Sequence, residues 1–166
     1  MVGKLYCLLI SILVLVVSMQ KTLAQEVSAG VDVALPAGDL SKAVGNGFGL
    51  SARYENEFGK RMSWLVDAGF LSFSGKGSAK SITMVPLQAG LKYYFQDQIN
   101  GLYVMGELGF HLVSGGSKSE TDFGVAPGIG YYFSDFDLGL KFQTINSPQG
   151  NYDYIGFRAA YIFPKR

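Results

Sequence analysis

The feature that most constrains this chain is an alternation of apolar and polar residues that recurs eight times after residue 25. Successive side chains of an extended strand point to opposite faces, so the alternation predicts strands with two chemically different sides. Apolar residues at helical spacing are not found in this part of the chain, so we expect an all-β fold without helices. The alternating segments are Glu26–Leu35, Gly47–Phe58, Met62–Phe73, Thr83–Phe95, Leu102–Val113, Phe123–Phe133, Phe136–Thr144 and Tyr154–Phe163.

The connections between these segments alternate in length. Those after the first, third, fifth and seventh segments are long and polar, for example "PAGDLSKAVGN" and "SGGSKSETD". Those after the second, fourth and sixth are short: "GKR", "QDQING" and "SD". Segments of about ten residues suit tilted strands that cross a membrane, because strands in soluble proteins are usually about 5–6 residues long. Long loops at one end and short turns at the other are typical of transmembrane barrels.

One phase of the alternation holds no charged residue, and the other phase holds nearly all the charges within the segments. Arg158 illustrates the contrast, because it stands in the otherwise uncharged run "YIGFRAAYIF". A charge in such a run must be solvated, be paired or point away from the apolar phase. We therefore predict a network of charges facing the lumen of a barrel. Its members are Asp32, Arg53, Glu55, Asp67, Lys92, Glu107, Asp137, Lys141 and Arg158.

The aromatic residues of the uncharged phase gather near the ends of the segments, whereas Val, Leu and Ala fill the middle. A soluble sandwich or barrel would also separate two faces, with the apolar face inside. Aromatic girdles on both sides of an aliphatic band favour lipid outside instead. The predicted girdle at the short-turn end consists of Tyr54, Trp64, Tyr93, Phe95, Tyr131, Phe133, Phe136, Tyr161 and Phe163.

The first 24 residues have the pattern of a secretory signal peptide. Lys4 supplies a positive start, residues 5–17 form a short apolar core, and Thr22-Leu23-Ala24 is a small-x-small cleavage motif. We expect cleavage after Ala24, which leaves residues 25–166 as one barrel domain. The alternative is an uncleaved membrane anchor. Mass spectrometry of the native protein should find Gln25 at its N-terminus, and an intact Met1 would contradict cleavage.

The whole chain after the signal peptide resembles the small outer-membrane β-barrel proteins of Gram-negative bacteria, of the OmpA-type and OmpX-type eight-stranded group. The resemblance is carried by the signal peptide, the eight alternating segments, "VPLQAGLKYYF" and the terminal "AAYIF" with Phe163. It implies an eight-stranded antiparallel up-and-down transmembrane barrel, exported through the periplasm to the bacterial outer membrane. It also implies a monomer that contacts outer-membrane lipid and lipopolysaccharide after handling by periplasmic chaperones and the barrel-assembly machinery. Phe163 would be the assembly signal, although Pro164-Lys165-Arg166 follow it here.

The sequence offers little support for catalysis. The chain has one His, one Cys and a formal net charge of +1, so no cofactor, metal site or nucleic-acid partner is expected. "DFG" at residues 122–124 and "SGKGS" at residues 74–78 lack the companion motifs of kinases and phosphate loops. His111 is interpreted as a polar lumen residue.

The leading function is therefore a structural, envelope-interaction or surface-contact role with a lumen filled by side chains. A narrow pore for small solutes is the alternative, disfavoured because eight strands leave an interior just wide enough for side chains. A barrel enzyme is the least supported of the three.

The order of the lumen charges predicts how they pair. At a similar depth the signs alternate along the first five strands, through Asp32, Arg53, Asp67, Lys92 and Glu107. After a gap at the glycine-lined sixth strand, Lys141 and Arg158 are both positive, and closing the barrel brings Arg158 beside Asp32. We therefore expect opposite charges on neighbouring strands, with Asp32 and Arg158 energetically coupled across the closing seam.

Overall fold

A computed structural model describes residues 25–77, 79–96, 100–116, 118–148 and 150–164. The predicted signal peptide, residues 1–24, lies outside the described residues.

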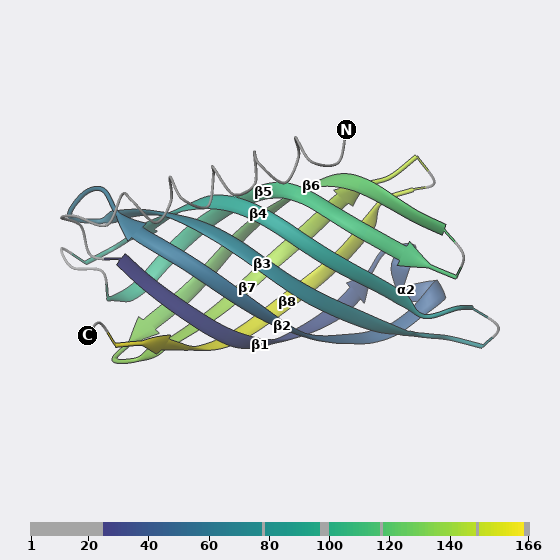
Figure 1. The fold of residues 1–166 in the computed structure, drawn as a ribbon, viewed down its shortest axis with the longest axis horizontal. Coiled ribbons are helices and arrows are strands. Elements are labelled where there is room, and N and C mark those ends of the chain that lie inside the picture. The colour runs from purple at the N-terminus through teal and green to yellow at the C-terminus, as the bar shows by residue number, and fades with distance from the viewer. Residues whose placement is uncertain (1–24, 78, 97–99, 117, 149, 165–166) are drawn as a thin grey trace, which may run out of the picture.

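Eight antiparallel strands form a closed barrel in which each strand pairs with the next and β8 pairs with β1 (Figure 1). The predicted fold class is confirmed, with the expected strand order. The strands are β1 (Gln25–Ala37), β2 (Val44–Glu57), β3 (Met62–Gly75), β4 (Ile82–Tyr94), β5 (Gly101–Gly115), β6 (Lys118–Phe133), β7 (Phe136–Asn146) and β8 (Tyr152–Phe163).

The two ends of the barrel differ less in loop length than the sequence predicted. At the turn end, where β1 starts and β8 ends, the connections are residues 58–61, 95–100 and 134–135. At the loop end they are residues 38–43, 76–81, 116–117 and 147–151. The predicted long loops were therefore too long, because much of each one continues the strands. β6, for example, begins at Lys118 and not at Phe123.

The strands were predicted too short because their outward side chains change character near the loop end. Beyond Phe70 the outward residues of β3 are Ser72 and Ser74, and beyond Phe142 those of β7 are Thr144 and Asn146. The alternation of apolar and polar residues stops there, but the backbone pairing continues.

The expectation of no helix was also wrong in one place. A short helix, α2 (Leu40–Ala43), follows β1 at the loop end and buries Leu40. Four residues are too few to show a 3.6-residue period, so the sequence pattern gave no sign of it.

No helix in the described part of the chain is long and apolar enough to cross a membrane.

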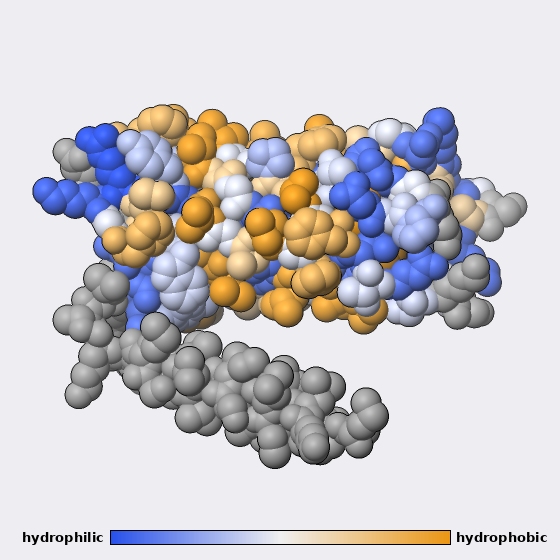
Figure 2. All heavy atoms as spheres, turned by 90° about the horizontal axis from the view of Figure 1, so that it is seen from above, coloured by the Kyte–Doolittle hydropathy of each residue, from blue (hydrophilic) through white to orange (hydrophobic). Residues whose placement is uncertain are grey.

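The outer wall carries a continuous apolar band between two polar ends (Figure 2). Outward side chains near mid-strand are large, apolar and exposed: Leu50 is 65% exposed, Leu87 57% and Leu108 55%. An exposed apolar surface of this extent marks contact with a membrane or a partner. A band that encircles a closed barrel, with all strand hydrogen bonds internal, matches the requirements of a bilayer.

Candidate functional site: the filled lumen

The charged phase of the strands faces inward. Eight of the nine predicted network residues are buried or partly buried and form ion pairs with one another. We call this set the charged belt: Arg53, Glu55, Asp67, Lys92, Glu107, Asp137, Lys141 and Arg158. Removing each ion from water costs several kcal/mol (order of magnitude), so every member needs partners.

Arg53 of β2 binds three acids from three other strands. Its Nε lies 3.0 Å from Asp67 Oδ2, its Nη2 2.6 Å from Glu107 Oε1, and its Nη1 3.4 Å from Asp137 Oδ2. Only Asp67 is on a neighbouring strand, where the register places it directly opposite Arg53. The guanidinium fork therefore ties β2 to β3, β5 and β7, and most of its pairing crosses the lumen.

Asp137 of β7 is the acid with the most partners in the belt. Besides Arg53, its Oδ2 lies 3.0 Å from Lys92 Nζ and 3.4 Å from Arg158 Nη1. Its Oδ1 accepts a hydrogen bond of 2.6 Å from Tyr103 Oη. Asp137 lies close to the turn end in sequence, so the predicted charge order left it out. The long side chains of Arg53, Lys92 and Arg158 extend to Asp137. The positions of these residues along their strands do not show this by themselves.

Two further groups of polar side chains extend the belt along the barrel axis. Toward the turn end, Glu55 accepts from Lys92 Nζ at 2.7 Å and from Tyr94 Oη at 2.7 Å, and also from Ser63 Oγ. Toward the loop end, Lys141 Nζ donates to Glu107 Oε2 at 2.7 Å and to Gln88 Oε1 at 2.9 Å.

The predicted pairing of Asp32 with Arg158 needs correction. The register does place the two residues opposite each other on β1 and β8. The Arg158 guanidinium, however, donates to Ser51 Oγ at 2.9 Å and to Ser28 Oγ at 3.0 Å, and its nearest acid is Asp137. Asp32 enters no ion pair among the described residues, and its Oδ2 has no hydrogen-bond partner there.

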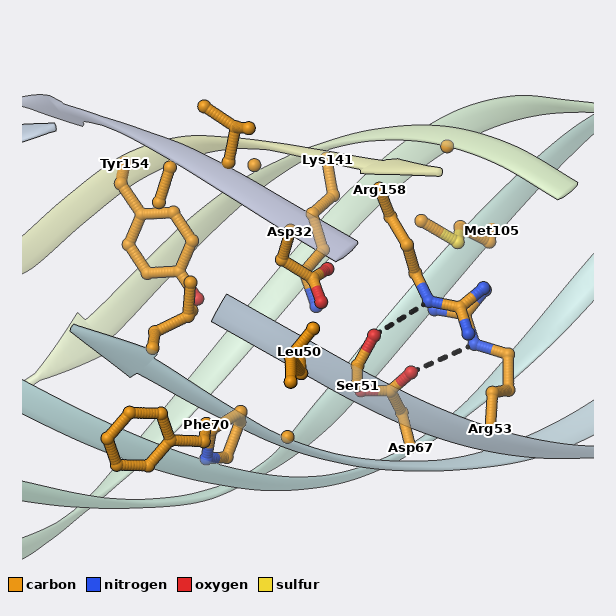
Figure 3. Close-up of a pocket in the computed structure, with 17 residues that line it drawn as sticks. Asp32, Leu50, Ser51, Arg53, Asp67, Phe70, Met105, Lys141, Tyr154 and Arg158 are labelled. Atoms are coloured by element: carbon orange, nitrogen blue, oxygen red, sulfur yellow. Dashed lines mark hydrogen bonds and ion pairs between the residues drawn. The ribbon is translucent and has the colours of Figure 1, made fainter. Parts of the chain in front are cut away.

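Asp32 instead lines a small cavity just above the belt (Figure 3). The cavity has a volume of about 20 Å³, and Tyr154, Lys141 and Arg158 also line it. The Tyr154 hydroxyl, like Asp32 Oδ2, is buried without a partner among the described residues. A space of this size holds about one water molecule.

Tyrosines of the charged phase were not singled out from the sequence, although the same alternation places them inside. Tyr94, Tyr103 and Tyr132 pack together near the turn end, with ring centroids 5.3 Å and 6.4 Å from Tyr94. The Tyr103 ring occupies the space beside Gly130, where an added Cβ would lie 2.2 Å from the ring. Glycine at this position lets the Tyr103 ring pack directly against the backbone of β6, with its hydroxyl hydrogen-bonded to Asp137.

Apolar side chains close the lumen at the loop end, which the sequence analysis did not anticipate. α2 contributes to this closure through Leu40, which is 3% exposed. The set is here called the mouth cluster: Ala34, Leu40, Val44, Leu71, Phe73, Met84, Val113, Ile145 and Tyr154.

His111 faces the lumen and is fully buried, as its phase predicted. Neither of its ring nitrogens has a hydrogen-bond partner among the described residues, so no nucleophile or acid is positioned by it there. The described residues also contain no group of three or more His, Cys, Asp or Glu side chains placed to hold a metal ion.

No family model and no curated protein matches the chain. Several solved structures do match its fold. Ail, the attachment invasion locus protein of Yersinia pestis, matches with a TM-score of 0.60 at 16% identity, covering 84% of this chain and 97% of Ail. Neisserial surface protein A matches with a TM-score of 0.60 at 15% identity, covering 86% of this chain and 97% of that one. The N-terminal β-barrel domain of Pseudomonas aeruginosa OprF gives 0.57 at 14% identity, covering 86% and 100%.

The chain has the fold of the small eight-stranded outer-membrane barrels. This fold agrees with the resemblance stated from the sequence, and the apolar band fits a barrel that lies in a membrane.

The barrel carries its predicted turn-end aromatics on the outer wall. Ring contacts join them in three separate groups: Tyr54 with Trp64 at 5.4 Å, Tyr93 with Phe95 at 5.8 Å, and a run from Tyr131 through Phe133, Phe136 and Tyr161 to Phe163. Phe163 ends β8 with half of its surface exposed and contacts Tyr161 at 5.6 Å. Its role as an assembly signal stays a prediction.

Proposed function

We propose that the protein is a non-enzymatic structural and interaction protein of the outer membrane, in which a closed barrel anchors and presents the loop end. The observation that carries this proposal is the filled lumen. The charged belt and the mouth cluster follow each other along the axis, and the cavity between them that Asp32 lines has a volume of about 20 Å³. Such an interior gives rigidity to a scaffold and offers no path to a solute.

The loop end is the part of the protein available for contacts, and its exposed basic residues favour an anionic partner. Lys76 and Lys80 are exposed there, and so is Lys42, whose charge is balanced by Asp39. Lys42 pairs with Asp39 at 2.7 Å; this hydrogen bond lowers the pKa of Asp39 and raises the pKa of Lys42. Lys76 Nζ donates to the Ser41 carbonyl at 2.8 Å. The anionic partner we propose is lipopolysaccharide.

A solved neighbour supports the idea of an anionic partner. Ail is described in complex with the heparin analogue sucrose octasulfate, a sulfate-rich sugar. At 16% identity this supports the kind of chemistry and not the residues that would carry it.

Single-channel recording in planar bilayers tests the closed-barrel role. We expect the purified chain to give no steady ohmic openings, because both layers of the lumen are packed. The double variant Phe73→Ala/Tyr154→Ala serves as a comparison that opens the mouth cluster alone. It should also stay closed, since the charged belt still blocks the lumen.

Steady openings from the unaltered protein would contradict the proposal and favour the narrow-pore alternative. Openings from the double variant alone would mean that the mouth cluster is the only barrier. The proposed handling by periplasmic chaperones and the barrel-assembly machinery, and the monomeric state, are independent of this outcome.

A further inference from the structure

A row of hydroxyl groups crosses four strands on the outer wall near the loop end. Ser72 of β3 pairs with Thr83 of β4, Thr83 with Ser114 of β5, and Ser114 with Ser119 of β6. All four lie on the outward phase, and Ser114 and Ser119 share a hydrogen bond of 3.0 Å. Neighbouring strands lie about 4.8 Å apart, so the row is about 14 Å wide.

The row lies immediately beyond the apolar band. Two residues closer to the turn end, the same phase holds Phe70, Val85 and Leu112 on β3, β4 and β5, which are 51%, 42% and 45% exposed. On β6 that position is Thr121, and the apolar band begins at Phe123. Two residues of strand rise about 6.6 Å, and the headgroup zone of a bilayer adds about 5–7 Å on each side of its hydrocarbon. Barrel strands are tilted by about 35–45°, so the row is inclined: it leaves the apolar band at Ser72 and rises by about 9 Å to Ser119, across the headgroup zone.

A cation lies above the row. Lys80 is exposed in the connection between β3 and β4, and its side chain lies over the β5–β6 turn, where a Cβ added to Gly116 would be 3.2 Å from Nζ. Within the described part of the chain, no acid forms an ion pair with Lys80. Glu120 of β6 lies on the inward phase of that strand.

On the other half of the barrel, the first outward row beyond the apolar residues of β1, β7 and β8 lacks this combination. There the last apolar row is Leu35, Ile155 and Phe142, and the next outward row is Ala37, Asp153 and Thr144. It offers one hydroxyl and one acid where β3–β6 offer four hydroxyls. The loop-end lysine on that side, Lys42, is already neutralised by Asp39.

We propose that the outer wall of β3–β6 at the loop end binds a phosphorylated glycolipid of the surrounding leaflet. Its acyl chains lie on the apolar band, its sugars contact the hydroxyl row, and Lys80 binds a phosphate group. The row is broader than one phospholipid headgroup, so linked sugar rings match it better. The proposal rests on the membrane placement and the anionic partner proposed above, and it names the face that makes the contact.

The test uses the full chain in nanodiscs of phosphatidylcholine doped with rough lipopolysaccharide, with dephosphorylated lipopolysaccharide or with phosphatidylglycerol. Native mass spectrometry measures how much of each dopant remains on the released barrel. Lys80→Gln and Ser72→Ala/Ser114→Ala are compared with Lys42→Gln and Thr144→Ala, their matched controls on the other half. Heat-dependent gel mobility confirms that each variant is folded.

We expect lipopolysaccharide to be retained, and Lys80→Gln to weaken its retention about fivefold, the effect of one basic residue near an anionic surface. The double hydroxyl variant should also weaken it, and both controls should leave it unchanged. Dephosphorylated lipopolysaccharide should be insensitive to Lys80→Gln.

Equal losses in the variants and the controls would overturn the assignment to β3–β6 while leaving a loop-end contact with lipopolysaccharide intact. Retention of phosphatidylglycerol as strong as that of lipopolysaccharide would overturn the glycolipid and leave a phosphate site. Cross-linking that places a second copy of the chain over Ser72 and Ser114 would also overturn the proposal. None of these outcomes changes the conductance result, which tests the closed barrel separately.

Discussion

The charged belt and the mouth cluster fill the same lumen, but the side chains on the inside and outside of the barrel wall differ between them. At the belt, Lys92 is buried inside while its neighbour Leu91 is 52% exposed outside. At the mouth cluster, Phe73 is buried inside while its neighbours Ser72 and Ser74 are exposed outside. On β3, the apolar side of the wall changes from the outside to the inside. On other strands the two overlap, since Met84 and Val113 are buried beside exposed Val85 and Leu112.

The change of side shows what surrounds each level of the barrel. Where lipid surrounds the wall, apolar side chains are most stable outside, and the polar atoms left inside must satisfy one another. Where water surrounds the wall, the same strands bury apolar side chains, as a soluble barrel does. The step from Phe70 to Ser72 on the outside of β3 therefore marks one boundary of the membrane.

The largest expected effect comes from breaking the charged belt. Arg53→Met leaves Asp67, Glu107 and Asp137 short of a donor, and stranding buried charges in this way costs about 3–5 kcal/mol. Chemical unfolding in lipid vesicles measures the change. Lys60→Met, at an exposed turn-end position, is the control and should change stability by less than about 0.5 kcal/mol. A small effect at Arg53 would mean that water reaches the belt.

The outer wall should respond to charge according to level. Leu108→Arg places a cation in the apolar band and should destabilise the barrel by about 2–4 kcal/mol. Ser74→Arg, on the outward phase near the loop end, should change stability by less than about 0.5 kcal/mol because water solvates it. Equal losses in the same unfolding assay would place the membrane boundary elsewhere.

Removing one hydroxyl from each region compares their polar interactions directly. Tyr103→Phe deletes the hydrogen bond to Asp137 and should cost about 1.5–3 kcal/mol, the range for bonds to charged groups. Tyr154→Phe deletes a hydroxyl without a hydrogen-bond partner in the described part of the chain and should cost less than about 1 kcal/mol. The reverse order would show that the cavity beside Asp32 holds a strongly bound group.

The smallest expected effect comes from removing one methyl group, either inside the mouth cluster or on the outer wall near the loop end. Ile145→Val removes a methyl from the packed mouth cluster and should cost about 0.5–1.5 kcal/mol. Ile155→Val removes the same methyl from the outer wall, where lipid refills the space, so its effect should be smaller. If the two variants unfold at the same denaturant concentration, the mouth cluster is not tightly packed.

The alternation of residues was sufficient to predict the barrel because its period is exclusive to strands. It assigned Lys92, Glu107 and Arg158 to the inside correctly, since a shift by one residue would have exposed each of them to lipid. The same alternation also places Tyr94 and Tyr103 inside, because they share the phase of Lys92 and Glu107. They were not predicted as lumen residues because only the charged residues of that phase were considered.

The partners of the charges were beyond the reach of the sequence. Alternation gives the side of a residue and a depth within about two residues, whereas a long Arg or Lys side chain covers that distance and also crosses the lumen. Arg53 therefore reaches Asp137 on the far wall, and Arg158 turns away from Asp32 toward the same acid. The mouth cluster was missed for another reason: its residues Phe73, Met84 and Ile145 look like ordinary strand ends until α2 and Leu40 cover them.

The position of Asp137 has a consequence for how the chain folds. Its donors come from β2, β4, β5 and β8, so a sheet that has not yet closed lacks at least one of them. An open sheet in hydrocarbon would expose both unpaired strand edges and unpaired ions, each of them strongly unfavourable. We therefore expect the last seam, between β8 and β1, and the ion network to form in one cooperative step, without a stable intermediate in which the sheet is inserted but still open.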